Sequence, residues 1–210
     1  MAVYLIGGPP KCGKTTLAKA LSKKLHIPWM SSDTLENLAW AYTPKEQHPA
    51  LFPHSYVRGE SNDEFYAHHA PEAIVQGYVE QSKATYDAIS MMAETYLTDK
   101  DDFIVEGYQV TPEIVSRILK KFGSEHIRTA FLIKQDAEKM VQDFHKSTTP
   151  NDWILRKTKK ETTFVKIAQM IAAYADYTEK EAKKYNLPVF EMDSDFSASL
   201  EKAMKHLMND

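Results

Sequence analysis

The stretch GPPKCGKT, residues 8–15, decides the fold of this chain. Its glycines and its Lys-Thr pair have the spacing of a phosphate-binding loop, a motif that lies between a strand and a helix. Before it, Ala2–Ile6 is a short, β-branched apolar run. After it, Lys14–Leu25 contains no proline and places its apolar residues at helical spacing. The sequence therefore predicts a strand, a glycine loop and a helix in direct succession.

The chemistry of this loop follows from its backbone. Glycines let the chain curl so that several N–H groups face one anion at the positive end of the new helix. Lys14 then reaches the β- and γ-phosphates of a nucleotide, and the Thr15 hydroxyl binds Mg²⁺. The alternative is an ordinary glycine turn that leaves Lys14 in solvent. We expect a nucleotide site made of Gly8, Lys11, Cys12, Gly13, Lys14, Thr15 and Thr16.

Length and composition limit the class of protein. A chain of 210 residues suits one domain. Its 43% hydrophobic content excludes collagen-like and wholly disordered chains. The formal net charge of −3 argues against a generic nucleic-acid binder. We expect a soluble globular protein without a nucleic-acid partner.

Targeting and cysteine content point to the cytoplasm. No secretory leader and no apolar run long enough to span a membrane is present, so we expect a cytoplasmic protein without a membrane partner. Cys12 is the single cysteine, which excludes an intramolecular disulfide and a cysteine zinc site. It is interpreted as a small filler of the loop, with a redox role as the alternative.

Short apolar runs alternate with helical patterns along the rest of the chain, which predicts a parallel sheet covered on both faces. Residues 43–59 contain three prolines and no sustained period, so we expect a loop there. Residues 153–185 show one long helical pattern. Further strands are predicted at Ile27–Met30, Phe103–Val105, Ile127–Ile133 and Pro188–Met192.

The loop at residues 8–15 and the strand that ends at Glu106 resemble those of the small P-loop kinases, which include nucleotide kinases, shikimate kinase and O-phosphotransferases. The resemblance implies an α/β fold with five parallel strands in the order 2-3-1-4-5. It also implies ATP as phosphoryl donor, Mg²⁺ as cofactor and a small-molecule acceptor as partner. On this basis residues 1–210 form one kinase domain, with a helical acceptor-binding insert at 34–100 and a lid at 146–160.

Two carboxylates are candidates for the transfer centre. The stretch PWMSSDTL, residues 28–35, is similar to the region that carries the catalytic aspartate of O-phosphotransferases, which makes Asp33 the candidate general base. Its alternative role is a helix N-cap. Glu106 resembles the acidic end of a Walker B strand and is the candidate partner of Thr15 at Mg²⁺; its alternative role is to cap the turn.

The chain holds four arginines, which limits the planar contacts available to phosphate or carboxylate groups. Arg156 stands with three lysines where the resemblance places the lid, so it is the candidate lid residue; the alternative is a solvated basic face. Arg58 and Arg117 are candidates for acceptor binding, together with Asp33. The aromatic residues around Arg58 are interpreted mainly as core, with an acceptor pocket as the alternative.

The expected activity is transfer of the γ-phosphoryl group of ATP to a hydroxyl group of a small molecule, with Lys14, Asp33 and Arg156 as catalytic residues. A nucleoside or nucleoside monophosphate kinase is one alternative. Residues 142–146 and 106–109 lack the arginines with which such kinases grip a nucleotide acceptor, which weakens the monophosphate reading. A second alternative is a nucleotide-dependent regulatory protein without phosphoryl transfer. The sequence leaves the acceptor, the choice of ATP or GTP, and the oligomeric state open.

Overall fold

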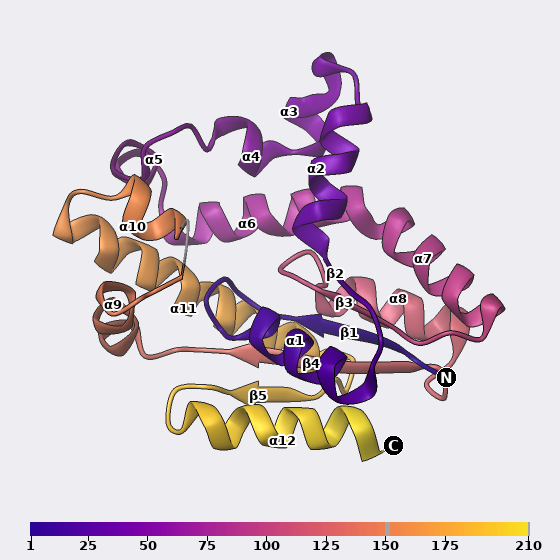
Figure 1. The fold of residues 1–210 in the computed structure, drawn as a ribbon. Coiled ribbons are helices and arrows are strands. Elements are labelled where there is room, and N and C mark those ends of the chain that lie inside the picture. The colour runs from indigo at the N-terminus through magenta and orange to yellow at the C-terminus, as the bar shows by residue number, and fades with distance from the viewer. Residues whose placement is uncertain (150–151, 210) are drawn as a thin grey trace.

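A computed structural model describes residues 1–149 and 152–209. Its five strands are all parallel and pair in the order β2-β3-β1-β4-β5, which confirms the predicted fold class (Figure 1). The three central strands are almost completely buried, as expected of strands covered on both faces, whereas the two edge strands are partly exposed. The strands are β1 (Val3–Gly7), β2 (Trp29–Ser31), β3 (Phe103–Glu106), β4 (Ile127–Ile133) and β5 (Val189–Glu191).

Helices cover both faces of this sheet. Successive side chains of β1 point to opposite faces, so Tyr4 and Ile6 join one buried cluster while Val3 and Leu5 join another. The first cluster includes α1 (Lys14–Leu25), α9 (Ala137–His145), α11 (Glu161–Lys184) and α12 (Phe196–Asn209). The second includes α7 (Tyr86–Asp99) and α8 (Pro112–Phe122). The molecule therefore has three layers.

The chain between β2 and β3 forms most of the remaining helices. They are α2 (Ser32–Tyr42), α3 (His48–Leu51), α4 (Pro53–Val57), α5 (Asn62–His68) and α6 (Pro71–Ser82), followed by α7. In Figure 1, α2 to α5 rise above the sheet. Ile74 and Tyr78 of α6 lie in the same buried cluster as Leu17 of α1. The insert therefore shares the core of the sheet.

Residues 43–59 are not the loop that the sequence predicts. They contain a 3₁₀ turn at Lys45–Gln47 and the short helices α3 and α4. A proline stands in the first turn of each helix, where its fixed φ angle suits a helix start. Phe52, which joins the two helices, is completely buried and anchors them.

The predicted helix over 153–185 is also wrong, because it is two helices. Residues Trp153–Lys157 form α10, Thr158 is extended (φ −121°, ψ 129°), and α11 starts at Glu161. The Asn62 amide donates to Thr158 Oγ1 at 2.7 Å, and the Asp63 carboxylate accepts from the backbone N–H groups of Lys159 and Lys160 at 3.0 and 3.2 Å. These tertiary hydrogen bonds hold the break open.

No helix within residues 1–149 and 152–209 is long and apolar enough to cross a membrane.

Candidate active site

The loop between β1 and α1 is shaped by two glycines with positive φ angles. A Cβ atom on Gly8 (φ +126°) would lie 2.1 Å from the Leu132 carbonyl oxygen, so only glycine fits between β1 and β4. Gly13 (φ +95°) is the N-cap of α1 and lets the chain turn into the helix. The unpaired N–H groups of the first helical turn therefore open onto the loop.

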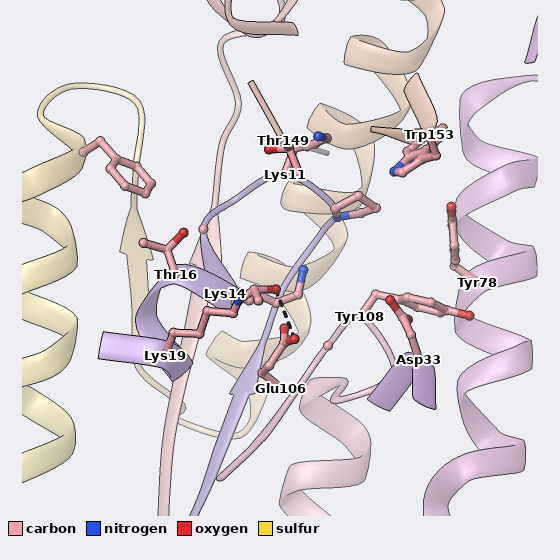
Figure 2. Close-up of a pocket in the computed structure, with 15 residues that line it drawn as sticks. Lys11, Lys14, Thr16, Lys19, Asp33, Tyr78, Glu106, Tyr108, Thr149 and Trp153 are labelled. Carbon is pink, nitrogen blue, oxygen red and sulfur yellow. Dashed lines mark hydrogen bonds between the residues drawn. The ribbon is translucent and has the colours of Figure 1, made fainter. Parts of the chain in front are cut away.

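Lys14 and Thr15 start α1 and point their side chains in different directions. Lys14 Nζ donates to the Pro9 carbonyl oxygen at 2.6 Å, and the residue is only 8% exposed. The Thr15 hydroxyl donates to Glu106 Oε1 at 3.0 Å, the contact drawn as a dashed line in Figure 2. The Lys14 side chain thus places a positive charge at the loop, and the Thr15 side chain places a hydroxyl group next to the end of β3.

Glu106 ends β3, the strand between β1 and β2, and is 2% exposed. Burial raises the pKa of its carboxyl group, while the Lys14 charge and the Thr15 hydroxyl act in the opposite direction. Among the described residues no group of three or more His, Cys, Asp or Glu side chains could hold a metal. Two neighbouring oxygen ligands nevertheless fit Mg²⁺, which keeps several waters and binds phosphate oxygens.

Asp33 lies in the first turn of α2, directly after β2. Its backbone N–H donates to the Ser31 hydroxyl, which is the N-cap of the helix, so Asp33 is not itself the cap. The Asp33 carboxylate accepts from Gln109 Nε2 at 3.1 Å. It faces the cavity, and desolvation by the surrounding elements raises its pKa, although the Gln109 hydrogen bond and the Lys14 charge act in the opposite direction.

The four groups share one cavity of about 690 Å³ (Figure 2). Lys11, Lys14 and Lys19 give the loop side three cations. Asp33 lies at the other side among aromatic rings. The complete lining consists of Pro10, Lys11, Gly13, Lys14, Thr15, Thr16, Lys19, Asp33, Tyr78, Glu106, Gly107, Tyr108, Thr149, Trp153 and Phe196.

Most residues of the predicted nucleotide site line this cavity, but Gly8 and Cys12 do not. Gly8 acts through its close packing on β4. Cys12 is completely buried, and burial raises the pKa of its thiol to about 11. A protonated thiol is a poor nucleophile, so the burial of Cys12 favours its interpretation as a packing residue over the redox alternative.

Two predicted arginines lie outside the cavity lining. Arg117 is exposed on α8, with its guanidinium carbon 3.6 Å from the centre of the Tyr86 ring on the second face of the sheet. Arg117, a predicted acceptor-binding residue, therefore does not line the cavity that contains Asp33. Arg156, the predicted lid residue, is exposed on α10 and does not line the cavity. The residues of the predicted lid that do line the cavity are Thr149 and Trp153, and they lie there together with Lys11 of the phosphate-binding loop. Of the predicted lid over 146–160, residues 150–151 lie outside the described residues.

Arg58 lies behind the cavity wall. Its guanidinium carbon is 5.3 Å from the centre of the Trp153 ring and 4.8 Å from that of Phe65, and it donates to the Asn62 side chain. Nη1 is buried and has no hydrogen-bond partner among the described residues. Arg58 therefore supports Trp153, and one of its donors stays open.

Sequence reasoning missed a buried polar group next to Asp33. Glu36, one helical turn further along α2, is 9% exposed and accepts hydrogen bonds from four side chains. No local motif marks these donors, because they come from distant segments. They are Ser55, Gln81, Tyr108 and Gln109.

The chain matches a known family over part of its length. Residues 4–95 match the model of the ATPase family associated with various cellular activities (AAA). A mevalonate-3-phosphate 5-kinase of Thermoplasma acidophilum is 23% identical over 120 residues, which cover 57% of this chain and 56% of that protein. An uncharacterized protein of Dictyostelium discoideum is 28% identical over 121 residues, 57% of this chain and 14% of that protein. The matched region thus spans about half or less of these relatives.

Solved structures extend the likeness to nearly the whole chain. A sugar kinase from Janibacter sp. HTCC2649 superimposes with a TM-score of 0.56 at 11% identity and covers 99% of this chain and 95% of its own. A gluconokinase from Sinorhizobium meliloti 1021 gives a TM-score of 0.54 at 10% identity, with 99% and 91% covered. These comparisons confirm the predicted resemblance: the chain has the fold of the P-loop small-molecule kinases.

Proposed function

We propose that this protein is an ATP-dependent kinase that transfers the γ-phosphoryl group to a hydroxyl group of a small molecule. One observation carries the proposal: the phosphate-binding loop, Glu106 and Asp33 open into the same cavity of about 690 Å³. Its loop side is cationic, and its other side places a carboxylate among aromatic rings. This arrangement supports two substrates bound side by side.

The loop side holds the donor. Its backbone N–H groups, with Lys14 and Lys11, bind the phosphates of ATP, and Lys14 exchanges the Pro9 oxygen for a phosphate oxygen. Thr15 and Glu106 hold Mg²⁺, which supplies charge neutralisation at the phosphates. We assign the cationic role to Lys11 and Lys14, which line the cavity, rather than to the exposed Arg156.

The other side holds the acceptor. Asp33 takes the proton of the acceptor hydroxyl as its oxygen forms a bond to the γ-phosphorus, and the bond to the bridging oxygen breaks so that ADP leaves with the electron pair. Tyr78, Tyr108 and Trp153 form the wall against which the acceptor packs. Arg58 packs behind Trp153 and supports this wall.

The test measures Mg²⁺-dependent ADP formation from ATP with nucleosides, nucleoside monophosphates, sugars, hydroxy acids and amino alcohols as acceptors. We expect one acceptor class to stimulate ADP formation. Asp33→Asn lowers kcat by about 100-fold or more, because a positioned base contributes at least that much, and leaves the Kd for ATP nearly unchanged. Lys14→Ala abolishes both binding and turnover.

Each outcome has a distinct meaning. Stimulation by a nucleoside or its monophosphate supports the nucleoside kinase alternative. Tight ATP binding without stimulation by any acceptor overturns the kinase proposal in favour of a nucleotide-dependent regulatory protein. Equal turnover in Asp33→Asn removes Asp33 from the mechanism.

A further inference from the structure

Gln109 lies in the loop after β3, directly behind Asp33, and is completely buried. Its side-chain amide nitrogen donates to Asp33 Oδ1 at 3.1 Å and to Glu36 Oε2 at 2.7 Å. Its amide oxygen accepts from the Ser32 hydroxyl. Both N–H groups of the amide therefore donate a hydrogen bond, and its oxygen accepts one.

The two carboxylates fix the orientation of this amide. Ionised carboxylates only accept hydrogen bonds, so the NH₂ group of Gln109 must face both Asp33 and Glu36. A flipped amide would place its oxygen against two carboxylate oxygens and leave its donors facing Ser32. Gln109 thus donates a hydrogen bond to Asp33 Oδ1, and among the described residues no side chain donates to Oδ2.

Glu36 anchors Gln109 to the insert. Glu36 Oε1 accepts from Ser55 of α4 and Gln81 of α6, both at 2.8 Å, and Oε2 accepts from the Tyr108 hydroxyl in addition to Gln109. A buried carboxylate that receives four hydrogen bonds is held in one geometry. Gln109 transmits this geometry to Asp33, which lies three residues before Glu36 on the same side of α2.

We propose that Gln109 is the positioning residue of Asp33: it holds Oδ1 and leaves Oδ2 open to the cavity for the proton of the acceptor hydroxyl. This inference rests on the proposed function, in which Asp33 is the base. The charged and titratable groups around Asp33 are Lys14 of α1, Glu36 of α2, Tyr78 of α6, and Glu106 and Tyr108 of β3 and its loop.

Gln109→Met tests the proposal, because methionine has a similar volume and donates no hydrogen bond. We expect kcat to fall by about 10- to 100-fold, the cost of a misplaced catalytic group, with the KM for ATP unchanged. The acidic limb of the kcat/KM profile moves to higher pH, because the Asp33 carboxylate loses a donor that favours its charged form. Carbon-13 NMR titration of the Asp33 carboxyl group, without nucleotide, shows the same upward movement.

Ser55→Ala is the matched control. It removes one donor from Glu36 Oε1 and leaves the Gln109 hydrogen bonds in place, so the Asp33 titration and the acidic limb stay where they are in the wild type. If Gln109→Met does not fold, Ser32→Ala, which frees the Gln109 amide oxygen, shifts the titration in the same direction by less.

An unchanged Asp33 titration in Gln109→Met overturns the proposal, as does an equal shift in Ser55→Ala, which would indicate a general effect of core packing. The two levels of inference fail separately. A wild-type protein that transfers no phosphoryl group refutes the proposed function, while the NMR titration still decides whether Gln109 holds Asp33.

Discussion

His54 is a single buried side chain of the insert that makes the stability of the folded protein depend on pH. The residue is 6% exposed and stacks on Tyr78 with 3.8 Å between ring centres. Burial lowers its pKa to about 3, and the charges of Arg58 and His69 act in the same direction. His54 therefore stays neutral in the folded protein over the range in which it charges in the unfolded chain.

The sign of the resulting pH dependence follows from the proton count. As the pH falls from about 6.5 towards about 3, His54 binds a proton in the unfolded chain but not in the folded protein. The free energy of unfolding therefore decreases by up to about 1.4 kcal/mol per pH unit. We expect His54→Phe to reduce the slope of unfolding free energy against pH by the amount that corresponds to about one bound proton. Urea denaturation at a series of pH values from neutral to acidic measures this slope, and equal slopes in the two proteins would contradict the prediction.

The residues of the phosphate-binding loop could be predicted from the sequence because their chemistry depends on local spacing. Gly8, Gly13 and Lys14 occupy positions fixed by the turn between one strand and one helix. Glu36 and Gln109 could not be predicted, because a glutamate on a helix resembles a solvated residue until its partners are known. Gln109 and Glu36 are separated by 73 residues, and only the fold brings them together.

At the scale of an element, α10 is a five-residue helix that depends on one carboxylate. Asp152 Oδ1 accepts from the Ile154 N–H at 3.0 Å, and Oδ2 pairs with Lys11 Nζ at 2.5 Å and accepts from the Ser147 hydroxyl at 2.6 Å. Burial alone would raise the pKa of Asp152, but these hydrogen bonds lower it. The helix is thus capped and tied to the phosphate-binding loop by one side chain.

Asp152→Ala is expected to loosen α10 selectively. The lost cap costs about 1 kcal/mol, and the lost Lys11 pair adds to it, so amide hydrogen exchange over residues 153–157 becomes faster while that of β1 and β4 is unchanged. Lys157→Ala is the control on the same helix, because its partner Glu60 is 97% exposed at the side chain and such pairs contribute little. Equal exchange rates in wild type and Asp152→Ala would contradict the prediction.

The predicted strands and the predicted helix over Lys14–Leu25 are found in the structure, because their hydrophobic period is local. The break between α10 and α11 escaped prediction, since a helical period continues through it. What ends the first helix is the hydrogen bond from Asn62, which is 96 residues away from Thr158. The strand order was implied by the resemblance to P-loop kinases and not by the periodicity.

At the scale of the whole molecule, the insert and the sheet form one buried core. Tyr66, Ile74 and Tyr78 of the insert lie in the same hydrophobic cluster as Ile6 of β1 and Leu17 of α1. A unit that shares its core with the sheet has little apolar surface to bury by itself, so it unfolds together with the sheet. This supports our proposal that residues 1–210 form a single domain.

We therefore expect one unfolding transition, the same by far-UV circular dichroism and by the fluorescence of Trp29, Trp40 and Trp153, which lie in β2, α2 and α10. ATP with Mg²⁺ at 100 times its Kd raises the free energy of unfolding by about 2.7 kcal/mol. For a chain of this length, that moves the single transition upward by about 5–11 °C. Lys14→Ala keeps the single transition but shows no shift with nucleotide, because the phosphates lose their cation. Two separate transitions, or a nucleotide shift seen by only one probe, would show that the insert folds independently of the phosphate-binding loop.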